Sequence, residues 1–206
     1  MTLTITTLLA FAFAMFILVA TPGPAFFVLT TRAISSGRRA GAGVVVGITI
    51  ADLIYFTLAL AGMTSLSASM GSAFVVIKFA GALYLIWLGV QMWRKKQTSV
   101  KLDQSKNSRG FLENVFEGLA VNLTNPKAII FFAALLPGFV NLSAITFVDA
   151  LILMLIITAV GGFIDLIYVL LAAQVRHAMQ SPRAQRVMNR IGATVLVGAG
   201  VSVAGR

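Results

Sequence analysis

The sequence has no cysteine, a single histidine and few charged residues. Without cysteine the chain cannot form disulfide bonds, carry out thiol redox chemistry or build a cysteine-ligated metal site. The lone His177 lies among basic residues of a polar segment, so we expect no metal and no cofactor. Charged residues make up 11% of the 206 residues, against about 25% in an ordinary soluble domain. The chain therefore has too little polar material to cover a soluble globule.

The chain is instead rich in hydrophobic residues. They make up 59% of the chain, and the mean hydropathy is +0.96. Lipid accepts an apolar exterior, but it requires that the backbone satisfy its own hydrogen bonds, as helices do. We therefore expect an all-α integral membrane protein.

Six apolar stretches predict six transmembrane helices. About 20 residues are needed to cross a hydrocarbon core of about 30 Å, and the last stretch is the shortest. The first stretch has no basic residue before Arg32, so we expect a retained span rather than a cleaved signal peptide. The predicted spans are residues 6–31, 40–62, 72–93, 114–138, 146–173 and 189–205.

The positions of Lys and Arg predict the orientation of these spans. Most of the 16 basic residues fall in the first, third and fifth connections, whereas the connections at 63–71 and 138–145 carry none. Basic loops stay in the cytoplasm, so both termini are expected on the outer side. This pattern explains the net charge of +10 through topology and lipid contact, and no nucleic-acid partner is expected.

The basic linker at 94–111 divides the chain into halves, 1–93 and 112–206, that share two features. Pro22-Gly23-Pro24 in the first span corresponds to Asn125-Pro126 in the fourth. The sequence Asp-Leu-Ile-Tyr occurs at 52–55 in the second span and again at 165–168 in the fifth. Because each half has three spans, the halves would lie in the membrane with opposite polarity. The sequence thus predicts two inverted three-helix repeats, a plan in which substrate binds near the midplane.

The few polar residues inside the spans are the candidate site. Proline removes a backbone donor, so we expect the first span to break at Pro22, Gly23 and Pro24, and the fourth at Asn125 and Pro126. At about 1.5 Å per residue, both breaks and both Asp residues fall at a similar depth. A carboxylate costs at least about 2.5 kcal/mol there, which favours a functional role for Asp52 and Asp165 as ligands of an ammonium group or as proton carriers. Lys127 is the expected counter-charge for an Asp or for a substrate carboxylate.

Two further residue patterns leave alternatives open. Tyr55 and Tyr168 each follow an Asp by three residues, on the same helix face. They are candidates for closing the outer and inner sides of the site, although ordinary aromatic packing would explain them equally. Gly43-x-x-x-Gly47 allows close helix packing, either within one protomer or in a homo-oligomer.

The assembled motifs resemble the lysine exporter / homoserine–threonine efflux (LysE/RhtB) family. The resemblance is carried by Pro22-Gly23-Pro24, by Lys78-Phe79-Ala80-Gly81-Ala82-Leu83-Tyr84-Leu85-Ile86-Trp87-Leu88-Gly89 and by Asn122-Leu123-Thr124-Asn125-Pro126-Lys127-Ala128. It covers nearly the whole chain and implies export of amino acids across the bacterial inner membrane by proton exchange. The third and fourth spans are more similar to the homoserine/threonine branch, which implies small, largely neutral substrates.

We therefore expect an alternating-access exporter whose partners are an amino acid, protons and membrane lipid, and not an enzyme. In this interpretation the broken helices and Lys127 hold the substrate carboxylate, and the two Asp residues hold its ammonium group or exchange it for a proton. A passive channel or lipid-interacting scaffold is an alternative. An intramembrane aspartyl protease would also use two buried Asp residues, but the Gly-x-Gly-Asp pattern typical of presenilin-type enzymes is missing before Asp165.

Overall fold

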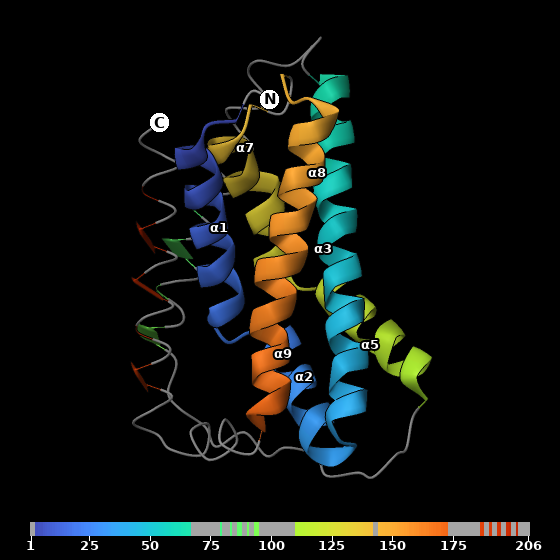
Figure 1. The fold of residues 1–206 in the computed structure, drawn as a ribbon. Coiled ribbons are helices and arrows are strands. Elements are labelled where there is room, and N and C mark those ends of the chain that lie inside the picture. The colour runs from blue at the N-terminus through green and yellow to red at the C-terminus, as the bar shows by residue number, and fades with distance from the viewer. Residues whose placement is uncertain are drawn as a thin grey trace.

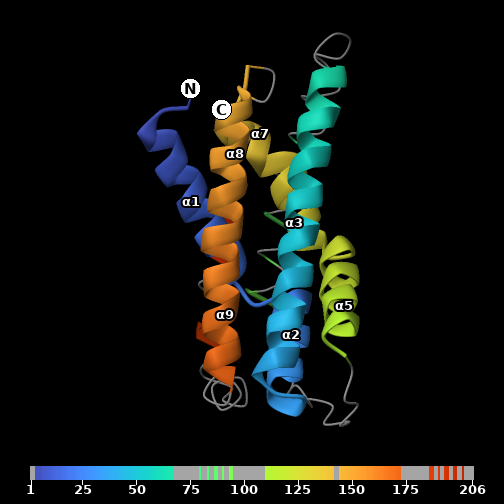
Figure 2. The same cartoon turned by 45° about the vertical axis from the view of Figure 1, so that its right-hand side comes forward.

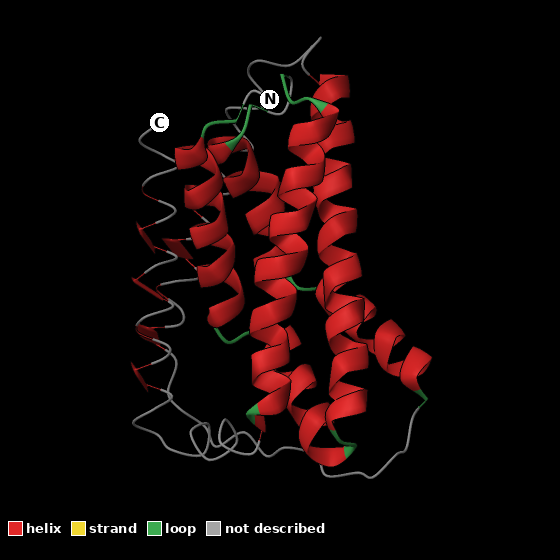
Figure 3. Ribbon diagram, in the orientation of Figure 1, coloured by secondary structure: helices red, strands yellow, loops and turns green. Residues whose placement is uncertain are grey.

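A computed structural model of the chain describes residues 3–66, 110–141 and 144–172, and single positions between 79 and 94 and between 186 and 201. All the regular secondary structure within these residues is helical (Figure 3). The predicted third and sixth spans and the linker 94–111 lie almost entirely outside the described residues. The described residues contain the first, second and fourth predicted spans and the fifth up to residue 172.

The first predicted span is a pair of helices, α1 (Ile5–Ala20) and α2 (Pro24–Ser35), bent by 60° at the intervening break. The side chain of Thr4 caps the start of α1 by accepting a hydrogen bond from the amide of Thr7. Pro24 occupies the first turn of α2, where its missing N–H costs nothing. The predicted break in the first span is confirmed.

The second predicted span is one long helix, α3 (Arg38–Leu66). Gly37 connects it to α2 with a φ of 89°, a conformation that residues with a side chain rarely adopt. Its segment Arg38–Ala61 is long and apolar enough to cross a membrane.

The fourth predicted span consists of α5 (Phe111–Leu123), α6 (Pro126–Ile130), the π-helix η1 (Phe131–Leu135) and α7 (Leu136–Phe139). The parts before and after Asn125 are bent by 57°. The predicted break at Asn125 and Pro126 is therefore confirmed as well.

The fifth predicted span consists of α8 (Phe147–Ile156), the π-helix η2 (Ile157–Gly161) and α9 (Gly162–Leu170). It begins with a capping box, in which the hydroxyl of Thr146 accepts from the amide of Asp149 and the carboxylate of Asp149 accepts from the amide of Thr146. Its segment Phe147–Leu170 is also long and apolar enough to cross a membrane.

In these four segments, the first and fifth run in one direction and the second and fourth in the other (Figures 1 and 2). In both views α1 begins at the end of the molecule where α3 ends, where α7 ends and where α8 begins. The start of α3, the start of α5 and the end of α9 lie at the opposite end. The first and fourth segments therefore run oppositely, as do the second and fifth. The inverted repeat remains a prediction, and these directions agree with it.

Glycines bring α3 and α5 into close contact. A Cβ atom at Gly47 would lie 2.0 Å from the carbonyl oxygen of Val115, and one at Gly118 would lie 2.2 Å from that of Val44. Such distances are impossible for a real side chain, so both positions require glycine. The predicted close packing around Gly47 thus occurs within the protomer.

Two apolar clusters lie on either side of the middle of the bundle. One is formed by α1, the later part of α3, η1, α7, α8 and η2, with Phe11 and Phe131 among its buried residues. The other is formed by α2, the first part of α3 and α9, with Leu29 and Val44 among its buried residues. Large apolar side chains such as Phe163 are also exposed on the outside, which suits contact with lipid.

Candidate functional site

The two breaks are built in the same way. At the first, Gly23 precedes Pro24 at the start of α2; at the second, Asn125 precedes Pro126 at the start of α6. The side-chain oxygen of Asn125 accepts a hydrogen bond from the amide of Lys127 at 3.1 Å and so caps α6. Each break ends one helix, and proline then starts the next at an angle to it.

The first break leaves backbone carbonyl groups without their helical donors. In an α-helix the carbonyl of residue i accepts from the N–H of residue i+4. Pro22 has no N–H for the carbonyl of Leu18, and Pro24 has none for the carbonyl of Ala20. In a membrane interior these oxygens need other donors.

Side chains from the second part of the chain supply those donors. The ammonium group of Lys127 donates to the carbonyl oxygens of Leu18 and Thr21, in each case over 2.6 Å. The hydroxyl of Tyr168 donates to the carbonyl oxygen of Ala20 at 3.1 Å. The break in the first span is thus completed by the fourth and fifth spans.

At the second break, the missing donor comes from the first half of the chain. The carbonyl of Leu123 loses its helical donor because the amide of Lys127 is turned to Asn125. The hydroxyl of Tyr55, from α3, donates to this carbonyl instead. Tyr55 and Tyr168 therefore tie each Asp-Leu-Ile-Tyr helix to the break of the other half.

Asp52 is held by an amide of α5. The side chain of Asn122 donates to the carboxylate of Asp52 at 2.8 Å and to the carbonyl oxygen of Ile48 at 3.1 Å. The side chain of Asn125 in turn donates to the side-chain oxygen of Asn122 at 3.2 Å. Asp52, Asn122 and Asn125 are all buried, so this chain of hydrogen bonds runs through the interior from α3 to the second break.

Asp165 is buried as well, and its carboxylate makes no hydrogen bond to the side chain of another described residue. It interacts electrostatically with Lys127 and with Asp52. Two carboxylates and one ammonium group therefore share one interior region. With all three ionised the region carries one net negative charge, which a proton or a substrate cation would neutralise.

These groups line a small cavity between the two apolar clusters. Its volume is about 30 Å³, room for roughly two water molecules. A free amino acid would have to widen it. Within the residues described, no group of three or more His, Asp or Glu side chains could hold a metal ion. The lining residues are Leu18, Val19, Ala25, Phe26, Ile48, Asp52, Asn122, Asn125, Lys127, Ala128 and Asp165.

The structure brings the predicted polar residues together, as their shared depth suggested. Asp52, Asn125, Lys127 and Asp165 line the same cavity, and Pro22, Gly23, Pro24 and Pro126 form the breaks beside it. Lys127 was expected to face an Asp or a substrate carboxylate. Its ammonium group donates to the carbonyl oxygens of the first break and also interacts electrostatically with Asp165 and Asp52.

Two features of the site were missed in the sequence. Asn122 was noticed only as part of a family motif, although an amide inside an apolar span is itself a signal of a buried hydrogen bond. The π-helix η2 lies just before Asp165 and ends at the Gly161-Gly162 pair. A π turn inserts one extra residue and so rotates the following helix face by about 100°. It thereby helps to aim Asp165 at the cavity.

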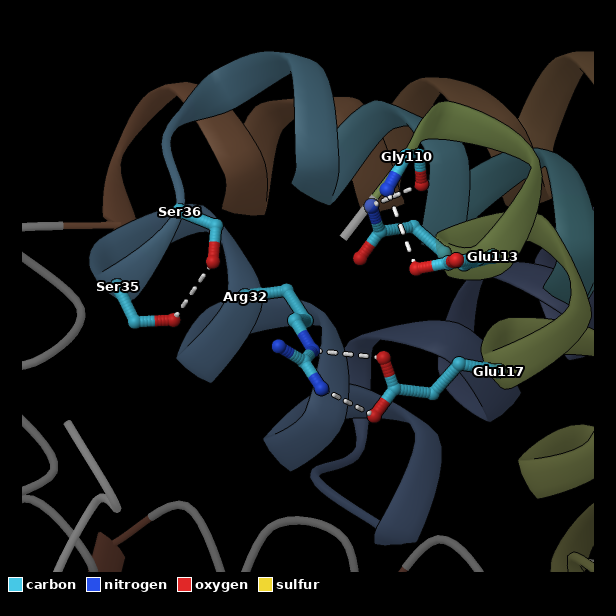
Figure 4. Close-up of polar contacts among 7 residues, drawn as sticks. Arg32, Ser35, Ser36, Gly110, Glu113 and Glu117 are labelled. Atoms are coloured by element: carbon cyan, nitrogen blue, oxygen red, sulfur yellow. Dashed lines mark hydrogen bonds and ion pairs between the residues drawn. The ribbon is translucent and has the colours of Figure 1, made fainter. Parts of the chain in front are cut away.

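A charged contact ties α2 to α5 near the basic end of the bundle (Figure 4). The guanidinium group of Arg32 donates to both carboxylate oxygens of Glu117, with N–O distances of 2.6 and 2.9 Å. Neighbouring Glu113 caps α5 through the amide of Gly110 at 3.2 Å. A paired, two-point contact of this kind fixes orientation as well as distance.

Broken spans that run oppositely around a buried charged cavity are typical of secondary transporters. The chain belongs to the LysE type translocator family, whose match extends over residues 16–205. The chain is thus a membrane translocator, and the predicted family is confirmed.

Individual relatives cover much of the same length. A homoserine/homoserine lactone efflux protein of Salmonella typhi is 32% identical over 170 residues, 82% of this chain and 82% of that protein. A threonine efflux protein of Salmonella typhi is 37% identical over 143 residues, 65% of this chain and 68% of that protein. An uncharacterized membrane protein of Synechocystis sp. is 31% identical over 192 residues, 91% of this chain and 90% of that protein. No solved structure shows a significant match.

Proposed function

We propose that this protein exports small, largely neutral amino acids from the bacterial cytoplasm across the inner membrane, in exchange for protons. The observation that carries the proposal is the cavity in which Asp52, Asp165 and Lys127 meet beside two helix breaks. Buried ionisable groups at such positions are a feature of substrate and proton pathways. The efflux of threonine and of homoserine named for the relatives supports an amino acid as the cargo.

The groups of an amino acid find complementary partners in this cavity. Lys127 and the opened helix ends bind the carboxylate, and the two Asp residues bind the ammonium group or exchange it for a proton. The name of one relative joins homoserine to its lactone, which keeps the ammonium group but has no free carboxylate. For a protein with related cargo, the ammonium group is therefore the more important recognition element.

Alternating access follows from the inverted repeat of 1–93 and 112–206 on either side of the linker 94–111. The small cavity lies between the two apolar clusters, so that either cluster can act as a barrier on its side. Rocking one half against the other opens each side in turn, and Tyr55 and Tyr168 close the site through their ties to the breaks. The basic ends of α2 and α3 face the cytoplasm, which puts both termini outside.

Transport into inverted membrane vesicles tests this function. The substrates to use are radiolabelled forms of those amino acids whose inhibition of growth is relieved in an overexpressing strain, with an imposed pH gradient as the driving force. We expect Asp165→Asn and Asp52→Asn each to lower coupled transport at least about tenfold, since a charge-assisted hydrogen bond contributes about 1.5–3 kcal/mol. Asp149→Asn is the matched control, because Asp149 is buried but caps α8 away from the cavity.

Two results would contradict the proposal. Unchanged coupled transport in both cavity variants would remove the two Asp residues from the mechanism. Flux that neither saturates nor responds to the pH gradient would indicate a passive channel.

A further inference from the structure

The ammonium group of Lys127 occupies a place that suits another primary ammonium group. It lies 2.6 Å from the carbonyl oxygens of Leu18 and Thr21. An ammonium group has three donors, of which these two carbonyl oxygens use two. Two carbonyl oxygens therefore accept from the ammonium group, and the carboxylate of Asp165 lines the same cavity.

The backbone at the first break keeps these carbonyl oxygens without a helical donor. Pro22 removes the helical donor of the Leu18 carbonyl, so that oxygen needs an outside donor in every conformation that keeps the break. The carbonyls also lie at the C-terminal end of α1, where the helix dipole favours a cation. Gly23 leaves room beside the ammonium group, since a Cβ there would lie 3.4 Å from both Cε and Nζ of Lys127.

We propose that the carbonyl oxygens of Leu18 and Thr21, together with Asp165, form the subsite for the α-ammonium group of the exported amino acid. Lys127 fills this subsite while no substrate is bound. The inference rests on the proposed function and names the ligand atoms of that site. When substrate enters, its ammonium group displaces that of Lys127, which turns to the substrate carboxylate.

Charge balance makes this exchange feasible. A zwitterionic amino acid adds one positive and one negative charge, so the net charge of the cavity does not change. The ammonium group of Lys127 then faces the substrate carboxylate, and the substrate ammonium group faces Asp165. This avoids leaving an uncompensated charge in the interior. The subsite selects primary amines, whereas Lys127 takes part in recognising the carboxylate.

A comparison of an exported amino acid with its methyl ester tests the assignment. The ester keeps the ammonium group but has no carboxylate, so it gains nothing from Lys127 and must still displace it. We expect Lys127→Met to change the ratio of the two dissociation constants, amino acid to methyl ester, by about tenfold or more in favour of ester binding. The measurement is made on purified protein. Tyr168→Phe is the control, because it removes a donor from the same break but leaves the subsite filled. An unchanged ratio, or equal weakening of both ligands, would overturn the assignment.

A second variant covers the case in which Lys127→Met does not fold or no amino acid is exported. Lys127→Ala removes the side chain beyond Cβ, a fragment that n-propylammonium replaces. We expect n-propylammonium to raise the thermal midpoint or the folded yield of this variant by a saturable amount. 1-Propanol, which lacks the charge, and propyltrimethylammonium, which lacks N–H donors, should have no such effect. Equal effects of all three compounds would refute the ammonium subsite, whereas absent export alongside propylammonium rescue would refute only the proposed function.

Discussion

The contact between α3 and α5 offers a stringent test of the structure, because glycine backbones meet there and no side chain can move aside. Gly47→Ala places a Cβ atom 2.0 Å from the carbonyl oxygen of Val115. Gly118→Ala places one 2.2 Å from the carbonyl oxygen of Val44. Either substitution must push the two helices apart.

The size of the effect follows from these distances. An ordinary contact needs about 3.4 Å, so Gly47→Ala requires a separation of about 3.4 − 2.0 = 1.4 Å. The hydrogen bond from Asn122 to Asp52, 2.8 Å long, joins the same two helices and would lengthen beyond hydrogen-bonding range. Overpacking costs about 1–3 kcal/mol or more, and the better helix propensity of alanine returns about 1 kcal/mol. Because the contact is with backbone, we take the upper end of the overpacking range and expect a net loss of about 2 kcal/mol, or roughly 4–8 °C in thermal midpoint for a chain of this size.

Thermal unfolding in detergent and coupled transport in vesicles measure the two consequences. The matched control is Gly162→Ala in α9, where a Cβ would meet nothing closer than the hydroxyl oxygen of Thr49 at 3.8 Å. There the gain in helix propensity should remain, so stability should be equal or higher. If Gly47→Ala and Gly118→Ala are as stable and active as the unmodified protein, α3 and α5 do not pack as described.

Three further predictions concern the polar ties. Arg32→Glu or Glu117→Arg alone should lower transport by placing like charges together, and the double reversal should restore part of it; no recovery in the double variant would show that the pair is not a contact. Tyr168→Phe leaves the carbonyl of Ala20 without its donor and should cost about 1–3 kcal/mol in thermal unfolding; unchanged unfolding would show that this hydrogen bond does not stabilise the break. Pro22→Ala returns an N–H to the carbonyl of Leu18, so it should compete with Lys127 and lower transport without lowering thermal stability; full transport would mean that the open carbonyl is not needed.

The helical fold and its two breaks could be predicted from the sequence because their causes are local. Apolar length predicts a span, and proline at Pro22, Pro24 and Pro126 removes specific backbone donors. The common depth of Asp52 and Asp165 could also be predicted, since the rise of a helix converts sequence position into depth. Each of these inferences needs only one segment and its distance from a charged end.

The partners of the polar groups could not be predicted, because they depend on rotation about each helix axis. The π-helix η2 changes that rotation just before Asp165, and only the Gly161-Gly162 pair hints at it. Lys127 could be assigned a partner of opposite charge, but the carbonyls of the first break compete for it. Which partner wins depends on how α6 is angled against α1, and the bend at Asn125 sets that angle.

The hydrogen bonds at the breaks also link the two parts of the chain to each other. The carbonyls of the first break take their donors from Lys127 and Tyr168, and the carbonyl of Leu123 at the second takes its donor from Tyr55. Any rotation of one part against the other must therefore remove donors from these carbonyls. In a membrane interior each such loss costs several kcal/mol unless water or a ligand replaces the donor. Entry of water or substrate and separation of the two parts are thus thermodynamically linked, and a ligand that carries its own N–H donors would favour the opened state.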